Sequence, residues 1–294
     1  MRGGVVKSPF TFNTKLNMSR YANTLRLLVV FAALIPPVRA TAQRGSPRQS
    51  DAYWLADCRD DYSRDYREKF CEVRHTQVPA PRGTLTVDGL RNGGVSVIGA
   101  DAGNLTITTR IQAQARTMAE AREIARQVRT VVSGSTIRAE GPGNLDDAWW
   151  SANLIIWAPK RSDLRISTSN GPVSVEEVTG DMELETRNGP LALRGLSGNV
   201  RARSSNGPLS ISLTGSRWEG RGLDAETSNG PLSLRIPEGY NAHLEARTSN
   251  GPMSLGFPVT MVGRIGRDIS TDLGSGGTTI RAVTHNGPLS IAHR

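Results

Sequence analysis

Residues 200–213 read Val-Arg-Ala-Arg-Ser-Ser-Asn-Gly-Pro-Leu-Ser-Ile-Ser-Leu, two alternating runs around an Asn-Gly-Pro turn. Each run alternates apolar or small residues with polar ones, which predicts a short strand with one buried face. Asn-Gly between such strands ordinarily indicates a hairpin. However, Pro208 has no N–H to donate across a hairpin, and the residue before proline prefers an extended backbone. We therefore predict a corner between two faces of a coil, with each strand pairing to the next coil.

The same corner occurs six times in the second half of the chain. The copies begin at Asn170, Asn188, Asn206, Asn229, Asn250 and Asn286, at intervals of 18, 18, 23, 21 and 36 residues. A recurring unit of this length is typical of repeat architectures, in which neighbouring units bury each other. We predict a mainly β, single-domain β-solenoid with about six stacked repeat coils and one N-terminal capping α-helix.

Charged residues fall in register between the predicted coils. Five residues before each corner Asn the chain has Arg165, Glu183, Arg201, Asp224, Glu245 and Arg281, and three residues before it has Ser167, Glu185, Arg203, Glu226, Arg247 and Val283. The sign mostly alternates, and parallel stacking at about 4.8 Å would favour each opposite pair by roughly 0.2–1 kcal/mol. We therefore expect Glu183/Arg201 and Glu185/Arg203 to be structural pairs rather than acid/base or calcium sites.

The first 42 residues have the composition of an export leader. They contain six basic residues and no acidic one, with a nine-residue apolar run at 27–35 and a small-residue stretch ending at Ala42. Nine apolar residues are too few to span a bilayer, so we predict a signal peptide at 1–42, with Met18 as an alternative start. No later segment is long and apolar enough to span a membrane. We expect an extracytoplasmic protein in the periplasm, at the cell surface or secreted.

The leader also accounts for most of the net charge. The formal charge of the whole chain is +9, but residues after 42 carry 30 basic and 27 acidic residues, interleaved along the chain. A nucleic-acid-binding protein is expected to show a basic stripe. The composition therefore argues against nucleic acid as a partner.

Residues 43–82 are predicted to be a polar linker followed by a disulfide-bridged segment. Cys58 and Cys71 are the only cysteines, and a pair in an exported chain most simply forms one disulfide. Tyr62, Tyr66 and Phe70 follow one another at intervals of four, which indicates a short amphipathic helix between the cysteines. Two thiols without a nearby histidine pattern make a poor metal site.

Residues 83–294 are predicted to form the solenoid domain, with a β-α-β cap at 83–160 and the repeat array at 161–294. Asn92-Gly-Gly is interpreted as a degenerate first corner. Thr117 and Glu120 form a capping box, and an apolar stripe from Met118 to Val132 predicts a long helix whose apolar face covers the first coil. The glycine-rich residues 256–277 are either one coil without the Asn-Gly-Pro corner or a loop covering an edge.

No cluster of residues indicates catalysis, a cofactor or a metal. The histidines are isolated in sequence and are expected to be solvated: His75, His243, His285 and His293. Asp146-Asp147 is interpreted as a solvated turn, with a cation or sugar site as the weaker alternative. Trp149, Trp150 and Trp157 are expected to fill the core, whereas Trp218 lies in an insertion and is expected to be exposed.

The uncharged serine column is the predicted docking face. It comprises Ser174, Ser210, Ser233, Ser254 and Ser290, beside the corner residues, with Trp218 as an aromatic candidate. Its hydroxyls could hydrogen-bond a glycan or the edge of another sheet.

The chain resembles the bacterial "putative adhesin" family of exported repeat domains. The resemblance rests on the Thr-Ser-Asn-Gly-Pro-Leu-Ser-Leu units, the segment from Trp150 to Pro159, and the tail containing Gly263-Arg-Ile-Gly266 and Leu273-Gly-Ser-Gly-Gly277. It covers roughly residues 84–294 and implies a β-solenoid-like fold with no established activity, hence no catalytic residues to assign.

We therefore expect a non-enzymatic exported surface or envelope protein that serves adhesion or envelope assembly. Its partner would be a cell-surface glycan or an envelope protein, and its ends could stack into an end-to-end homo-oligomer. A polysaccharide-acting β-helix enzyme and an extracytoplasmic sensory partner of a membrane protein are the two alternatives.

Overall fold

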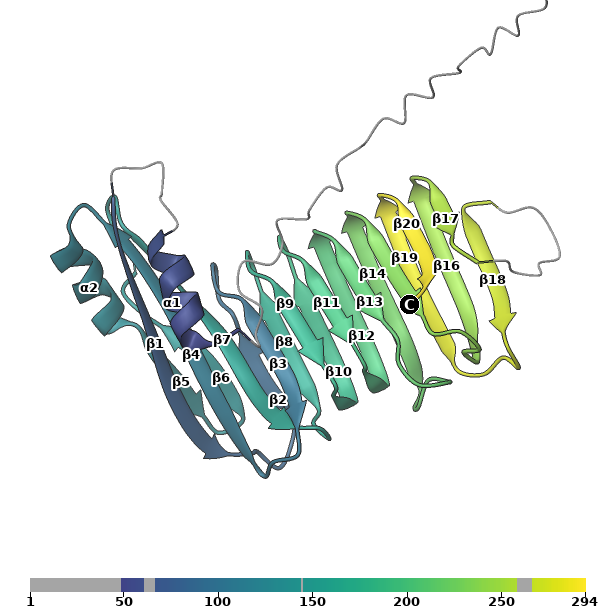
Figure 1. The fold of residues 1–294 in the computed structure, drawn as a ribbon, viewed down its shortest axis with the longest axis horizontal. Coiled ribbons are helices and arrows are strands. Elements are labelled where there is room, and N and C mark those ends of the chain that lie inside the picture. The colour runs from purple at the N-terminus through teal and green to yellow at the C-terminus, as the bar shows by residue number, and fades with distance from the viewer. Residues whose placement is uncertain (1–48, 61–66, 144, 258–265) are drawn as a thin grey trace, which may run out of the picture. The chain divides into compact units, whose positions relative to one another are not determined.

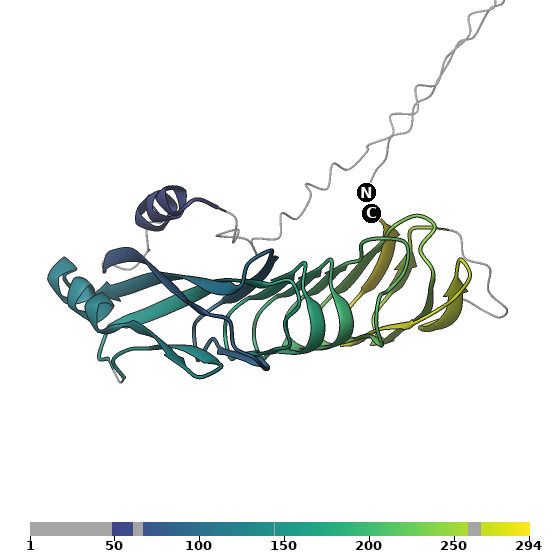
Figure 2. The same cartoon turned by 90° about the horizontal axis from the view of Figure 1, so that it is seen from below.

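The computed structural model describes residues 49–60, 67–143, 145–257 and 266–294 (Figures 1 and 2). All of them belong to one compact unit, Ala42–Arg294. The predicted leader, including Met18, lies outside the described residues, as do Tyr62 and Tyr66.

The described chain forms two ten-stranded sheets, so the prediction of a mainly β protein is confirmed. Sheet A has, in spatial order, β1 (Glu68–Pro79), β4 (Asn104–Ala115), β7 (Trp149–Pro159), β3 (Val95–Ala100), β9 (Val173–Glu176), β11 (Leu191–Arg194), β13 (Leu209–Ser212), β15 (Leu232–Ile236), β20 (Leu289–His293) and β17 (Met253–Leu255). Sheet B has β18 (Asp268–Leu273), β16 (Ala242–Asn250), β19 (Thr279–Asn286), β14 (Gly222–Asn229), β12 (Ser197–Asn206), β10 (Thr179–Thr186), β8 (Leu164–Thr168), β2 (Leu85–Asp88), β6 (Thr136–Glu140) and β5 (Arg129–Ser133). The inward side chains of both sheets form one buried apolar cluster.

Each Asn-Gly-Pro corner leads from a strand of sheet B to a strand of sheet A. For example, the corner at Asn188 joins β10 to β11; β10 pairs in parallel with β8 and β12, and β11 pairs in parallel with β9 and β13. The two strands of a corner therefore belong to different sheets, as the missing proline N–H predicts, and the hairpin alternative is wrong.

The corner glycines are needed because neighbouring corners stack closely. A Cβ built on Gly189 would lie 2.2 Å from the carbonyl oxygen of Gly171, and one on Gly207 would lie 2.1 Å from that of Gly189. Among the described residues, no corner glycine of an Asn-Gly-Pro copy has a positive φ. Glycine is thus required here by close backbone approach rather than by a left-handed conformation.

The corner asparagines form a continuous hydrogen-bonded ladder. The Nδ2 of Asn188 donates to Oδ1 of Asn170 at 2.9 Å, and Asn206 donates to Asn188 in the same way at 2.9 Å. In spatial order the ladder runs through Asn92, Asn170, Asn188, Asn206, Asn229, Asn286 and Asn250. Asn92 stands at one end of it, which confirms that Asn92-Gly-Gly is a degenerate corner.

A buried hydroxyl supports each corner from the neighbouring strand. Oγ1 of Thr186 donates to the carbonyl oxygen of Gly171 at 3.1 Å, and Oγ1 of Thr227 donates to that of Gly207 at 3.0 Å. The same contact is made by Thr168, Ser204, Thr248 and Thr284. A buried carbonyl left without a partner is costly, so the Thr or Ser two residues before each Asn has a structural role.

The last corner unit does not follow chain order. Strand β19 lies between β14 and β16, and β20 lies between β15 and β17, so the C-terminal strands are inserted between earlier ones. Strand β18 then pairs antiparallel with β16 at the edge of sheet B. Of the two alternatives for residues 256–277, the described part agrees with a segment covering an edge; residues 258–265 lie outside the described residues.

The long helix is shorter than the apolar stripe predicts. Helix α2 spans Met118–Gln127, with Oγ1 of Thr117 accepting from the backbone N–H of Glu120, as the capping box predicts. Val131 and Val132 lie instead in β5, which pairs antiparallel with β6. The stripe changes period at Val128, whose backbone is extended and ends the helix. Gly134, with a φ of 58°, allows the tight turn between β5 and β6. Buried α2 residues pack against the β1 end of the sheets, contacting β4 and β1 (Figure 1).

The cysteine segment contains a helix, but not at the predicted place. Cys58 and Cys71 are joined by a disulfide, which links α1 (Asp51–Asp60) to β1. Phe70 lies in β1, so the predicted helix through Phe70 is wrong at that residue. Trp54 is buried beside the disulfide, and the guanidinium of Arg110 stacks over its ring at 5.6 Å. Phe70 packs against the cluster that contains α2 residues rather than against the disulfide.

Candidate functional site

The predicted serine column is a row on the outer side of sheet A. Ser210 is the register partner of Ser233, Ser233 of Ser290, and Ser290 of Ser254, while Ala192 separates Ser210 from Ser174. Ser96 extends the row, because its Oγ lies 2.6 Å from Oγ of Ser174. The structure thus brings the serines together in a flat, uncharged row.

Trp218 does not belong to an exposed site. Its side chain is only 5% exposed, it packs in the main core, and its Nε1 donates to the carbonyl oxygen of Gly198 at 3.0 Å. The prediction of an exposed aromatic is wrong, because the insertion that carries Trp218 folds back over the core. Trp149, Trp150 and Trp157 were expected in the core and are half-buried.

The charged residues on the outer face of sheet B form ion pairs, but some of them pair with a different neighbour from the one expected. Glu183 pairs with Arg165 at 2.9 Å rather than with its other register neighbour, Arg201. Arg203 pairs with Asp224 and, at 3.7 Å, with Glu226, rather than with its register neighbour Glu185. The expected partners Glu183/Arg201 and Glu185/Arg203 are adjacent, but Glu183, Arg201 and Arg203 each pair with the neighbour on their other side, and no ion pair of Glu185 occurs among the described residues.

Asp224 and Glu226 are the centre of this network. Burial raises the pKa of Asp224, but hydrogen bonds from Arg203 and Arg281 outweigh it and bring that pKa below its ordinary value. A hydrogen bond from His285 lowers the pKa of Glu226 despite partial burial. Both carboxylates are therefore ionised and hydrogen-bonded to neighbouring side chains, so neither is suited to proton transfer near neutral pH.

Asp147 has a partner as well. Its carboxylate accepts a hydrogen bond from Nη2 of Arg116, and this contact lowers the pKa of Asp147. The proposed cation or sugar site at Asp146-Asp147 thus has one of its two carboxylates committed to an arginine.

Sequence reasoning missed a Ser-His-Asp row on sheet B. Nε2 of His243 lies 3.2 Å from Oγ of Ser270, and Nδ1 of His243 lies 2.7 Å from Oδ1 of Asp272. Catalytic triads bury the carboxylate that orients the histidine, whereas the Asp272 side chain is 65% exposed. Glu245 also lies 3.9 Å from Nε2 of His243 and competes for the same nitrogen. The row is connected like a triad but lies on an open sheet face.

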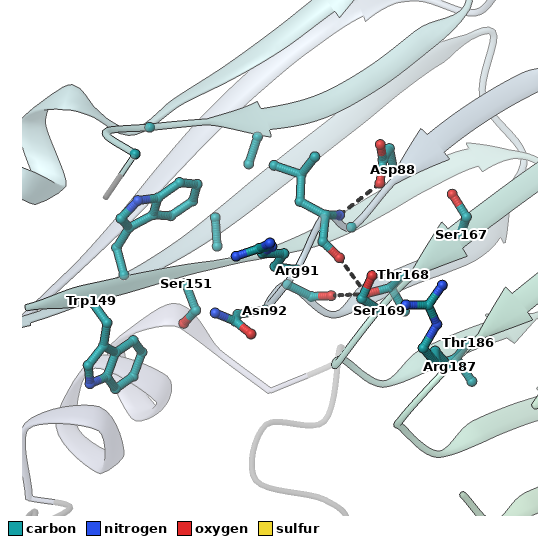
Figure 3. A pocket seen from close by; sticks show the side chains of 18 of the residues that line it. Asp88, Arg91, Asn92, Trp149, Ser151, Ser167, Thr168, Ser169, Thr186 and Arg187 are labelled. Carbon is teal, nitrogen blue, oxygen red and sulfur yellow. Dashed lines mark hydrogen bonds between the residues drawn. The ribbon is translucent and has the colours of Figure 1, made fainter. Parts of the chain in front are cut away.

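A groove of about 990 Å³ lies at the first corners and is the strongest candidate site (Figure 3). One wall comes from the segment that leads into β7 and from the start of β7, which contributes Trp149, Trp150 and Ser151. The other comes from the corner residues of four successive units: Arg91, Asn92, Ser169, Arg187 and Ser205.

The tryptophans of this groove are held in place by their indole nitrogens. Nε1 of Trp149 donates to Oε1 of Gln114 at 3.0 Å, and Nε1 of Trp150 donates to the carbonyl oxygen of Pro142 at 2.8 Å. A Cβ on Gly141 would lie 2.6 Å from the Trp150 ring, so that ring is covered on one side. Trp149 therefore lines the groove with an indole whose orientation is fixed by this hydrogen bond, so little side-chain entropy remains to be lost on binding.

Neither a metal centre nor a membrane span emerges from the residues that the structure describes. Over these ranges, no group of three or more His, Cys, Asp or Glu side chains could hold a metal ion. The helices of the same ranges are too short or too polar to cross a membrane.

Two facing sheets of mostly parallel strands, joined at stacked corners, define a solenoid-like β protein. The chain belongs to the Toastrack DUF4097 family, whose model matches residues 83–292. This agrees with the adhesin-like resemblance of the sequence. A comparison with curated proteins found no match.

The solved structures that match this chain include three proteins from bacteria. A "putative cell adhesion protein" from Clostridium sporogenes ATCC 15579 is 10% identical with a TM-score of 0.43, and the match covers 77% of this chain and all of that one. A "putative adhesin" from Bacteroides fragilis NCTC 9343 is 13% identical with a TM-score of 0.36, covering 76% and 97%. A "putative lipid binding protein" from Parabacteroides distasonis ATCC 8503 is 10% identical with a TM-score of 0.34, covering 76% and 96%.

Proposed function

We propose that the protein is a non-enzymatic, extracytoplasmic binding scaffold that attaches to a polysaccharide of the cell envelope or cell surface. In this proposal residues 1–42 are removed on export, residues 43–82 are a linker and bridged segment, and residues 83–294 act as one domain. The corner units stack as coils, and α2 closes the β1 end. The disulfide between Cys58 and Cys71 supports an oxidising compartment.

The observation that carries the proposal is the groove at the first corners. It combines the fixed indole of Trp149 with hydroxyl, amide and guanidinium groups on the opposite wall (Figure 3). Aromatic surfaces bind the apolar faces of sugar rings, and polar groups set orientation. The corner residues repeat at the strand spacing of about 4.8 Å. A surface with a regular repeat suits an extended polymer better than a compact small molecule.

The serine row on sheet A is the second surface of the scaffold in this proposal. Its exposed members, Ser210, Ser254 and Ser290, leave a flat strip without charge on the opposite sheet from the ion-pair network. Such a strip suits contact with an envelope protein or a second copy of the chain.

The proposal is tested by binding of the purified exported protein to immobilised envelope polysaccharides. We expect retention on at least one polysaccharide, and loss of retention in Trp149→Ala. Because that change also removes a hydrogen bond to Gln114, Trp149→Phe serves as a second variant, and the melting temperatures of both are compared with the parent protein. Absence of binding to every envelope polysaccharide and to intact cells would overturn the proposal.

A further inference from the structure

We propose that the corner groove selects a polysaccharide that carries carboxylate groups on its sugars. This inference rests on the proposed function, because it names the class of polymer that the same groove would take. It comes from the charges and free hydrogen-bonding groups of the wall opposite Trp149.

Two arginines of that wall are free to bind an anion. Arg91 and Arg187 are exposed, and within the described ranges neither forms an ion pair or a side-chain hydrogen bond. Most charged side chains on the neighbouring sheet B face are, by contrast, paired with each other. A guanidinium binds a carboxylate through two parallel N–H donors, which makes each arginine a specific carboxylate site.

The two arginines are spaced by the repeat. Both occupy the position directly before a corner Asn, and Ser169 occupies that position in the unit between them. Two steps of about 4.8 Å place their backbones about 10 Å apart. Charges at this separation suit the carboxylates of every second sugar in a chain of uronic acids, with the intervening sugar lying over Ser169.

Asn92 adds a free donor between the aromatic and cationic groups. It stands at the end of the asparagine ladder, where its Oδ1 accepts from Nδ2 of Asn170 at 3.2 Å. Asn92 lines the groove (Figure 3). Among the described residues, none accepts a hydrogen bond from its Nδ2. This amide can donate to a sugar hydroxyl or to the carboxylate held by Arg91.

The acidic residues of the same wall reduce the affinity of the groove for negatively charged ligands. The Asp88 carboxylate accepts from the backbone N–H of Leu90 at 2.8 Å, and Arg203 is held by Asp224. Glu185, also in the lining, has no ion-pair partner within the described residues. This carboxylate repels an anionic ligand, so only ligand carboxylates held by Arg91 and Arg187 are favoured in the groove. A nucleic acid is disfavoured because the charges after residue 42 are interleaved along the chain and form no basic stripe.

The test compares polygalacturonate with its fully methyl-esterified form, which has the same sugar chain without the charge. We expect the exported protein to bind polygalacturonate, with affinity falling as salt rises. Arg91→Ala and Arg187→Ala should each weaken binding about tenfold, the loss of one charge-assisted contact. Glu185→Gln should strengthen binding, because it removes a repulsive charge. Arg235→Ala, an exposed arginine on β15 of sheet A, is the matched control and should leave binding unchanged.

The results that would contradict the carboxylate assignment differ from those that would contradict the proposed function. Equal binding of the esterified polymer would overturn the carboxylate assignment while leaving the proposed polysaccharide function intact. Stronger binding of polyphosphate than of polygalacturonate, unaffected by Glu185→Gln, would overturn it in favour of a phosphate ligand. If neither galacturonan binds but a neutral envelope polysaccharide does, the inference is wrong and the proposed function stands. If no polysaccharide of any kind binds, both are wrong.

Discussion

Arg281 donates a hydrogen bond from Nη1 to Oδ1 of Asp224 at 2.6 Å, across 57 residues of sequence. The contact exists because β19 lies between β14 and β16. In chain order Asp224 would instead face Glu245, another carboxylate. The observed strand order gives strict alternation along sheet B: Arg165, Glu183, Arg201, Asp224, Arg281 and Glu245. Side-chain charge therefore favours the inserted order over the sequential one.

A double-mutant cycle measures this preference. Asp224→Asn and Arg281→Gln each remove one partner of the pair, and the coupling between them should be about 0.5–1 kcal/mol in the free energy of unfolding, allowing for solvent screening. Unfolding in urea, followed by tryptophan fluorescence, gives the four values. The pair Arg138 and Glu140, which lies within β6, is the control and should couple no more than an ordinary surface pair. Coupling near zero for Asp224 and Arg281 would contradict the assigned role.

Stability should fall in acid because of the same network. The pKa values of Asp224 and Glu226 are lowered by folding, from ordinary values of 3.8 and 4.5. A carboxylate with a lowered pKa binds more protons when unfolded, so its contribution is present above the ordinary pKa and is lost as pH falls through the folded pKa. We expect the midpoint of urea unfolding to decrease below about pH 4.5 and to decrease less steeply in Asp224→Asn. Equal acid sensitivity of the two proteins would count against the network.

The stacked corners should not tolerate a side chain. Gly189→Ala would place its Cβ 2.2 Å from a backbone oxygen that cannot move aside independently, so we expect a loss of about 1–3 kcal/mol or more. Gly83→Ala is the matched control, because a Cβ there would have no atom within 4 Å. Thermal unfolding by circular dichroism compares the two variants. An unchanged melting temperature for Gly189→Ala would show that the corners do not stack as described.

Ser270 should be an ordinary hydroxyl despite its place beside His243. The orienting carboxylate of Asp272 is largely in water, which weakens its hold on the imidazole. We expect no labelling of the protein by a fluorophosphonate probe at neutral pH. Labelling that disappears in Ser270→Ala, with a folded variant protein, would establish a nucleophilic serine and favour a serine hydrolase.

The corner was predictable because its causes are local. Pro208 lacks an N–H and restricts the backbone of the residue before it, so these few residues are enough to exclude a hairpin. The strand order was not predictable from the motif, because a Thr or Ser, an Asn and a Gly recur in every unit and allow any two units to stack. Only the charged side chains distinguish the orders, and the like-charged neighbours Asp224 and Glu245 were the signal that chain order is wrong.

Less of the candidate site than of the fold could be predicted from the sequence. Trp149 is far in sequence from Arg91 and Arg187, and only the sheet topology brings them to one groove. One signal was present: Arg91 and Arg187 stand before corner asparagines where Ser169, Ser205, Ser228 and Ser249 stand in other units. Trp218 was misplaced because an insertion in a repeat suggests an exposed loop, whereas its indole is held by Gly198 over the core.

A crystal structure of the exported protein with a short oligogalacturonate would test most directly where the protein binds its ligand. We predict sugar density in the corner groove, with one ring against Trp149 and carboxylates on Arg91 and Arg187. Density along the serine row of sheet A, with the groove empty, would contradict the assignment of the groove as the binding site.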